Sequence, residues 1–493
     1  MIVSFRPCIE DTGREDRYRN TDASTPICVR MAGTYEPTWS SLDAHPVPQW
    51  FDDAKLGIWI HWGIYSVPAW APPPAEPPEH AYAEWYPYYM YRPGNRFYEY
   101  HRETYGADVD YADFIADWTA AAFDPNAWAE LFADIGARYV VITGEHHDGF
   151  PLWDTAVTKY NASQMGPERD IVAELADAVR RRGLKFAPSF HGLLNYYQPD
   201  PDAPQGQPIG ADGGDPPSPE YVAYMHDKLD ELIEAYKPDL LWLDGDWIAD
   251  AETFGTKATV ARYYNAAEHW GKEVVVNDRL GRTRWKHEGD THGDFYTPEY
   301  EEFDEIVEHK WEACRGIGHS FGYNQAEGQA EYLDPRELVH LFVDTVAKNG
   351  NLLINVGPTA DGRIPEPQRL RLEALGGWLD QYGEAIFGTT YWITHDDPTS
   401  TVPVRYTWKD GTLYAIALEW PGDDLRLAVP EHVDIDPAAI EIRLLGQAGK
   451  LACRRRGRTL TIDTPGQPRE VHVQYAHAFA IDDVANPATA DDE

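Results

Sequence analysis

The 493-residue chain is poor in cysteine and has no long apolar run. Its four cysteines, Cys8, Cys28, Cys314 and Cys453, lie far apart, with the spacing of neither a disulfide framework nor a zinc site. No segment approaches the ~18 uninterrupted apolar residues of a membrane-spanning helix. The N-terminus turns polar too early for a signal peptide. These deficits predict a protein of the reducing cytoplasm that does not enter a membrane.

Positive charge is also scarce, and lysine is the scarcest part of it. The chain has 82 acidic residues against 42 basic ones, which gives a net charge of −40, and only 12 of the basic residues are lysine. Such a field repels phosphate backbones and anionic lipids, so we expect no nucleic-acid partner and no membrane partner. Acidity with little lysine favours a salt-adapted, halophilic protein, because molar salt screens a dense acidic surface. A merely acidic protein is the alternative.

Short apolar runs alternate with helix-like stretches between about residues 50 and 388. The runs are mostly continuous, as is typical of parallel strands buried on both faces. We expect strands at 56–61, 139–143, 184–190, 240–244, 274–277 and 352–356, and two more that are hard to place within 290–320. We expect helices at 126–135, 171–182, 219–236, 259–270 and 335–347. This alternation predicts an α/β fold, a (β/α)₈ TIM-like barrel.

After Gly388 the pattern changes to short alternating runs separated by turn residues. We expect strands at 413–418, 425–429, 440–444, 460–462 and 471–475, which together predict a C-terminal antiparallel β-sandwich. The predicted organisation is an N-terminal extension over 1–45, the barrel over 46–388, the sandwich over 389–480 and a disordered acidic tail over 481–493. Nothing in the sequence settles the oligomeric state, which leaves a homo-oligomer open.

Polar residues gather where the predicted barrel strands end, which is the rim that carries active sites in this fold. The first strand ends at His61, the second at Glu145, His146 and His147, the fourth at Trp242 and Asp244, and the fifth at Arg279. Asp244 follows a run of apolar residues and precedes Gly245, so we expect its carboxylate at the mouth of the barrel. A single histidine or aspartate at a strand end is usually structural, but several on one rim favour a functional site.

Cleavage of a glycosidic bond needs two carboxyl groups on either side of the anomeric carbon. Asp244 is the natural first member, and the segment HGDFYTPEYEE offers Glu299 as the second. Such an acid needs a raised pKa to stay protonated near neutral pH. The 18 tryptophans and 30 tyrosines agree mildly with a carbohydrate ligand, because aromatic faces stack on the apolar faces of sugars. In a protein this acidic, an exposed loop acid is the alternative interpretation of Glu299.

At these residues the chain resembles the α-L-fucosidase family of retaining glycosidases, glycoside hydrolase family 29. The resemblance rests on ordered segments from about residue 55 to 365, among them KLGIWIHWGIYSVPAW, AEWYPYYMY, VITGEHHDGF, LLWLDGDW, VVVNDR, GDFYTPEY and KNGNLLINVGPTADGRIP. It implies a barrel with a C-terminal β-sandwich, retention of configuration, a fucose-containing saccharide as substrate, no cofactor and no metal.

The resemblance also assigns roles to residues. It implies Asp244 as nucleophile, from the LWxDG-type motif, and Glu299 as acid/base, from GDFYTPEY. The residues implied to bind fucose are His61, Glu84, Trp85, His146 and His147, followed by Trp242 and Arg279. Either Trp85 or Trp242 would pack against the C5-methyl side of the sugar.

Two stretches depart from the family pattern. Where the family usually has Lys before HHDG, this chain has Glu145, and where it tends toward Tyr-Tyr-Ser, this chain has Ser189, Phe190 and His191. These changes leave a related glycosidase with altered sugar specificity as an alternative function.

Two other classes of protein compete with the glycosidase. One is a metal-dependent barrel hydrolase that uses His61, His146, His147 and Asp244. Against it, adjacent histidines on an extended strand point to opposite faces. The other is a non-catalytic sugar-binding protein, which the paired carboxyl candidates disfavour.

Overall fold

The computed structural model describes residues 34–72, 82–200, 202–204, 216–286, 289–431, 433–468 and 474–487. Most of the predicted N-terminal extension and the end of the predicted acidic tail therefore lie outside the described residues. Within these ranges the strands are β1 Leu56–Ile60, β2 Tyr139–Glu145, β3 Lys185–Phe190, β4 Leu240–Leu243, β5 Val275–Val276, β6 Trp311–Gly316, β7 Gly350–Val356, β8 Val404–Lys409, β9 Thr412–Ala417, β10 Asp424–Ala428, β11 Ile442–Leu444, β12 Cys453–Arg456, β13 Thr459–Asp463 and β14 His477–Ile481.

The α-helices are α1 Trp39–Leu42, α2 Gln49–Ala54, α3 Tyr86–Tyr89, α4 Arg96–Thr104, α5 Pro125–Asp134, α6 Ile171–Arg181, α7 Pro219–Tyr236, α8 Ala251–Phe254, α9 Thr256–Trp270, α10 Pro335–Ala347 and α11 Glu366–Tyr382. Short 3₁₀ helices occur at η1 Ile64–Ser66, η2 Ala83–Trp85, η3 Tyr111–Asp117, η4 Asp246–Ile248 and η5 Gly383–Ala385. Every helix expected from the sequence is present, with ends that differ by at most three residues. In the described part of the chain, no helix has both the length and the apolar character to cross a membrane.

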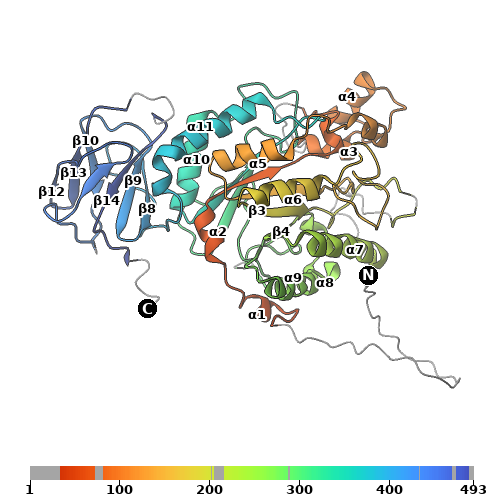
Figure 1. Cartoon of the computed structure of the whole chain (residues 1–493), viewed down its shortest axis with the longest axis horizontal. Coiled ribbons are helices and arrows are strands. Elements are labelled where there is room, and N and C mark those ends of the chain that lie inside the picture. The colour runs from red at the N-terminus through yellow and green to blue at the C-terminus, as the bar shows by residue number, and fades with distance from the viewer. Residues whose placement is uncertain are drawn as a thin grey trace, which may run out of the picture. The chain divides into compact units, whose positions relative to one another are not determined.

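The strands β1 to β7 form one parallel sheet in the order β5-β4-β3-β2-β1-β7-β6. Figure 1 shows helix α6 lying beside strand β3 of this sheet. The segment 295–299 completes the ring between its two edges. Phe295 bridges Asn277 after β5, while Tyr296 and Glu299 bridge Trp311 and Cys314 of β6, all in parallel register. The fold is therefore the expected barrel with one irregular strand. Pro298 explains the irregularity, because proline has no N–H to donate to a ladder.

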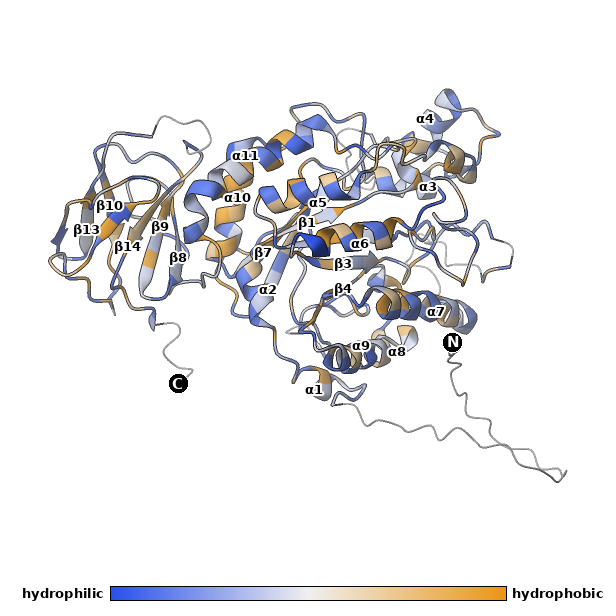
Figure 2. Cartoon of the chain, viewed as in Figure 1, coloured by the Kyte–Doolittle hydropathy of each residue, from blue (hydrophilic) through white to orange (hydrophobic). Residues whose placement is uncertain are grey.

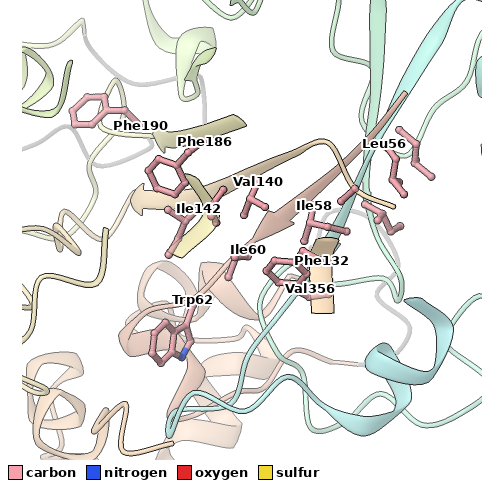
Figure 3. Close-up of a cluster of buried hydrophobic side chains, with 14 of the residues drawn as sticks. Leu56, Ile58, Ile60, Trp62, Phe132, Val140, Ile142, Phe186, Phe190 and Val356 are labelled. Atoms are coloured by element: carbon pink, nitrogen blue, oxygen red, sulfur yellow. The ribbon is translucent and has the colours of Figure 1, made fainter. Parts of the chain in front are cut away.

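The strand side chains divide between two cores. In β1, Leu56, Ile58 and Ile60 belong to the core between the sheet and the helices, together with Phe132 of α5 (Figure 3). Trp59, one position out of phase, belongs instead to the cluster that fills the barrel. Both faces of each strand are thus buried, and this is why the sequence shows continuous apolar runs.

The helices carry mixed surfaces and well-defined starts. Hydrophobic and hydrophilic residues share helices such as α5 and α6 (Figure 2), which pack their apolar residues against the sheet. The side chain of Asp124 accepts hydrogen bonds from the first backbone N–H groups of α5, and that of Asp334 forms a capping box with Glu337 at α10. Both helices begin with a proline, Pro125 in α5 and Pro335 in α10.

The C-terminal region contains two antiparallel sheets, β10-β13-β12 and β11-β14-β9-β8. Leu425 and Ile462 of the first pack against Phe479 of the second. The expected strand at 471–475 falls largely outside the described residues, while β14 was not expected. β14 is buried throughout because Phe479 faces this sandwich core whereas Ala478 and Ala480 face the core that includes α11. It therefore lacks the polar alternation of a half-exposed strand.

Candidate active site

The predicted strand-end residues meet at one end of the barrel, as parallel strands require. Asp244 follows β4 directly, and the backbone turns sharply there. Gly245 has φ 91°, and a Cβ at this position would lie 2.6 Å from the backbone nitrogen of Leu194. Only glycine tolerates both the angle and the contact. The turn directs the Asp244 side chain to the rim.

A cavity of about 350 Å³ opens at this rim. One side is aromatic and the other is charged. Its lining residues are Tyr82, Trp85, Tyr88, Tyr89, His147, Asp244, Trp247, Arg279, Arg284 and Glu299. The rings of Trp85 and Trp247 are nearly parallel, with centroids 6.4 Å apart and 24° between their planes. A small cavity with flat aromatic walls and a few converging polar groups suits a single sugar ring.

Asp244 is held by three side chains. Arg279 Nη1 donates to its Oδ1 at 2.6 Å, while His147 Nε2 and His191 Nδ1 lie 3.5 and 3.4 Å from its Oδ2. Burial by itself would raise the pKa of Asp244, but the charge of Arg279 and the two imidazoles outweigh it and hold this pKa well below its usual value. The Asp244 side chain is 11% exposed. Asp244 is therefore an ionised carboxylate with access to the cavity.

Glu299 faces the same cavity from the irregular strand. Arg279 Nη2 donates to its Oε2 at 3.1 Å, and Tyr82 Oη donates to its Oε1 at 3.1 Å. Its side chain is 31% exposed, so this carboxyl is wetter than that of Asp244. One guanidinium thus contacts both carboxylates, and Asp244 and Glu299 both line the same cavity.

His61 and His146 lie beside the cavity, not in its lining. His61 Nδ1 is 2.7 Å from Asn355 Oδ1, and burial lowers the pKa of His61 to about 3. Burial also places the pKa of His146 well below its ordinary value. The ring centroids of His146 and His147 are only 4.5 Å apart, because both residues lie beyond the end of β2. The expectation that these two side chains point to opposite faces was wrong.

Glu84 is buried under the cavity and anchors a loop. Its Oε2 accepts hydrogen bonds from the backbone N–H of Gly322 at 2.7 Å and from Ser320 Oγ at 3.3 Å. Burial raises the pKa of Glu84 to about 7, and the negative charge of Glu299 adds to the shift. The next residue, Trp85, does reach the cavity. Of this predicted pair, only the tryptophan lines the space that a ligand would occupy.

Trp242 occupies a different place from the one expected for a sugar-contacting residue. It is fully buried inside the barrel, where its Nε1 donates to Glu312 Oε1 at 3.0 Å and the Arg279 guanidinium lies 4.5 Å above its ring. As a residue in the middle of β4, it points inward to the barrel core, whereas the rim begins at Asp244. Its role here is to support Arg279. Trp247, which follows the turn, provides the second aromatic wall.

His191 is a member of the site that the sequence treated only as a departure. It follows β3, and its Nδ1 lies 3.4 Å from Asp244 Oδ2 while its Nε2 lies 3.0 Å from Ser189 Oγ. Its position at a strand end was the signal that could have identified it. Tyr82, Tyr88, Tyr89, Trp247 and Arg284 were missed for another reason, because they come from loops whose path the strand pattern does not predict.

The other departures lie behind the cavity. Glu145 is fully buried and pairs with Lys228 of α7, with 2.5 Å between Oε1 and Nζ. Phe190 belongs to the core between the sheet and the helices (Figure 3). Ser189 accepts a hydrogen bond from Trp59 Nε1 inside the barrel. Neither Glu145, Ser189 nor Phe190 lines the cavity.

Comparisons with known proteins identify the family of this chain. A family model described as alpha-L-fucosidase matches residues 26–384, and one described as the alpha-L-fucosidase C-terminal domain matches residues 396–482. The tissue alpha-L-fucosidase of Mus musculus is 35% identical over 426 residues, which are 85% of this chain and 87% of that protein.

Solved structures give the same result for the fold. The alpha-fucosidase of Thermotoga maritima in complex with fucose is 37% identical, with a TM-score of 0.75 over 91% of this chain and 100% of that chain. The same enzyme in complex with a mechanism-based inhibitor has a TM-score of 0.76 and also 37% identity, and the match covers 91% and 99% of the two chains.

Proposed function

This chain belongs to the alpha-L-fucosidase family, and we propose that Asp244 and Glu299 are the two carboxyl groups with which it hydrolyses terminal α-L-fucosides. The enzyme is a retaining glycoside hydrolase that acts on fucose-containing saccharides. The observation that carries the residue assignment is the pair itself. Both carboxylates face one aromatic-walled cavity and accept hydrogen bonds from the two terminal nitrogens of one arginine guanidinium.

The first step forms a covalent intermediate. The Asp244 carboxylate attacks the anomeric carbon while the bond to the departing oxygen breaks, and the carboxylic acid of Glu299 gives that oxygen its proton. Asp244 suits the role of nucleophile because its neighbours keep it ionised. A protonated carboxyl group would be a poor nucleophile. Glu299 suits the acid because its greater exposure lets it exchange protons with solvent.

The second step releases the sugar. Glu299, now a carboxylate, takes a proton from water as the water oxygen attacks the anomeric carbon and the bond to Asp244 breaks. Two displacements on opposite faces of the carbon give net retention. Arg279 stabilises the departing Asp244 carboxylate. Its contact with Glu299 keeps the two carboxyl groups in a fixed relative position.

The sugar itself is held by contacts of two kinds. His147 and Arg279 line the cavity and bind ring hydroxyls, with His61 and His146 completing the same wall from behind. The nearly parallel rings of Trp85 and Trp247 receive the apolar face and the C5 methyl. A shaped apolar wall is worth about 1–3 kcal/mol for one methyl group, which distinguishes fucose from galactose-like sugars.

The test is turnover of a panel of nitrophenyl glycosides, with the anomer of the first product followed by proton NMR. We expect α-L-fucoside to be cleaved fastest and α-L-fucose to appear before β-L-fucose. A preference for another sugar would mean that the aromatic walls do not select for the C5 methyl group. If the β anomer appeared first, Asp244 would not be a nucleophile.

We also propose that the enzyme works in a salt-rich, reducing cytoplasm. The net charge of −40 with only 12 lysines supports this, as does the free buried thiol of Cys314. The same substrate panel, measured from low to multimolar KCl, tests the proposal. We expect kcat/KM and the melting temperature to rise with salt, and a flat or falling profile would refute the salt adaptation.

A further inference from the structure

We propose that His147, His191 and Asp244 form a binding site for a divalent transition-metal ion such as Zn²⁺, and that the ion inhibits the enzyme by occupying its nucleophile. One ligand atom from each residue lies within 4.8 Å of the other two, and all three residues are buried. The proposal that the metal binds is argued from the positions of these three side chains. The proposal that it inhibits also rests on the proposed role of Asp244 as nucleophile.

The tautomer of His147 leaves the correct nitrogen for a metal. Its Nδ1 lies 2.8 Å from the carbonyl oxygen of His191 and 3.2 Å from that of Leu194. A carbonyl oxygen can only accept, so Nδ1 must carry the hydrogen. The other ring nitrogen, Nε2, lies 3.5 Å from Asp244 Oδ2. A cation in this gap would be bound by the Nε2 lone pair and by Oδ2.

His191 supplies the third ligand. Its Nε2 is held by Ser189 Oγ at 3.0 Å, which fixes the ring. Its Nδ1 lies 3.4 Å from Asp244 Oδ2 and, among the described residues, has no hydrogen-bond partner. A buried and unpartnered nitrogen aimed at a carboxylate is an available metal ligand. Backbone carbonyls on His147 and a hydroxyl on His191 are also the outer partners that metal-binding histidines use.

The spacing agrees with zinc. Bonds of ~2.0–2.2 Å to nitrogen and oxygen in a tetrahedral site place neighbouring ligands about 3.3–3.5 Å apart. The two contacts with Asp244 Oδ2, at 3.5 and 3.4 Å, match this edge. Arg279 binds the other oxygen, Oδ1, and does not occupy the site. His147 and Asp244 line the cavity, so the fourth position opens to solvent or to a sugar hydroxyl.

His191 follows β3. Together with His61 and His146 it also forms a second group of buried ligand atoms. Zinc on Asp244 Oδ2 would consume the lone pair that attacks the anomeric carbon, so metal and substrate would compete for one place.

Direct binding is the first test. Zn²⁺ is titrated calorimetrically into the full-length chain after treatment with EDTA. We expect one ion per chain, and an affinity at least ~10–100-fold lower in His191→Ser. His191→Gln gives a second variant of similar size in case the serine variant misfolds, and His269→Ser on the exposed face of α9 is the matched control with unchanged affinity. Equal affinity in wild type and both His191 variants would overturn the site.

Inhibition of nitrophenyl α-L-fucoside hydrolysis is the second test. Zn²⁺ should raise the apparent KM, leave kcat unchanged and lose its effect on adding EDTA, with a higher inhibition constant in His191→Ser. A fall in kcat at constant KM would place the inhibitory ion elsewhere, and activity abolished by EDTA would make the metal catalytic. If no fucoside were turned over while zinc binding still depended on His191, the proposed function would fail and the metal site would stand.

Discussion

Asp244 and Glu299 share one guanidinium group. Arg279 donates from Nη1 to Asp244 Oδ1 at 2.6 Å and from Nη2 to Glu299 Oε2 at 3.1 Å. Asp244, which follows β4, and Glu299, in the irregular strand, are thereby held in a fixed relative position. Arg279 itself is 2% exposed and rests on the indole of Trp242, so the pair stands on a rigid base.

Asp244→Gly should abolish hydrolysis. We expect kcat to fall by at least ~10⁴-fold, because no other carboxylate can form the covalent intermediate. Azide should restore turnover and give the inverted β-L-fucosyl azide, identified by NMR. Asp246→Asn is the control, since that buried carboxylate pairs with Arg284 and not with the reacting carbon. An equal loss in both variants, without rescue, would contradict the assignment of the nucleophile.

Glu299→Ala should slow substrates with poor leaving groups far more than activated ones. A loss of ~10²–10⁴-fold is expected where the departing oxygen needs a proton, and little loss for a dinitrophenyl fucoside. Azide should here give the α-L-fucosyl azide, with retained configuration. Glu84→Gln, which loses a buried loop anchor outside the cavity lining, should show no such rescue. Azide rescue of the Glu84 variant and not of the Glu299 variant would mean that Glu84 is the acid/base.

Arg279→Lys should move the acid limb of kcat/KM to higher pH. Arg279 is the largest influence that lowers the pKa of Asp244, while burial opposes it. Lysine cannot contact two carboxylates in a fork, so that pKa rises and the ionised nucleophile is lost first on the acid side. The pH profile measures this. Arg262→Lys, at an exposed pair with Asp230, should leave the profile in place.

Glu312→Gln should flatten the pH dependence of stability. Burial raises the pKa of Glu312 from its ordinary 4.5 to about 7. A raised pKa means that the stabilising contribution is complete below about pH 4.5 and is lost as the pH rises through about 7. The fall of the unfolding free energy over this window should be less steep in the variant by up to ~1.4 kcal/mol per pH unit.

Urea unfolding from pH 5 to pH 8 measures that slope. The glutamine oxygen can still accept from Trp242 Nε1 and its amide nitrogen can donate to Tyr139 Oη, while the titration is removed. Glu373→Gln, at an exposed position of α11, is the matched control and should keep the wild-type slope. A variant with the slope of the wild type would mean that Glu312 does not titrate in this range.

Lys228→Met should destabilise the protein strongly, and Glu145→Gln added to it should recover much of the loss. The single change leaves a buried carboxylate without its partner, at a cost of about 3–5 kcal/mol. Thermal unfolding measures both variants. Because this pair lies behind the cavity, the double variant should keep the wild-type preference among sugars. A changed preference would show that Glu145 reaches the substrate after all.

Several parts of the site could be predicted because they follow from local pattern. Asp244 ends an apolar run before Gly245, and both features survive in the structure as a strand end and a tight turn. Glu299 came from a motif, and the structure shows why no strand pattern revealed it. Its segment contributes isolated bridges interrupted by Pro298 instead of a regular ladder.

Other parts needed the folded chain. Trp242 and Trp247 look alike in sequence, five residues apart on either side of the turn, yet one fills the barrel and the other lines the cavity. Glu145 seemed to belong to the pocket because it precedes two histidines, but it turns to Lys228 on α7. The pairing of His191 with Asp244 joins two strand ends whose distance no spacing specifies.

Periodicity and contiguous motifs along the chain were enough to predict the succession of strands and helices, the rim that carries the polar residues and the family. Which of those residues line the cavity, which carboxyl groups are buried and which nitrogens face Asp244 became known only from the folded chain. Burial and pKa arise from contacts between segments brought together only when the barrel closes, and those contacts have no signature along the chain.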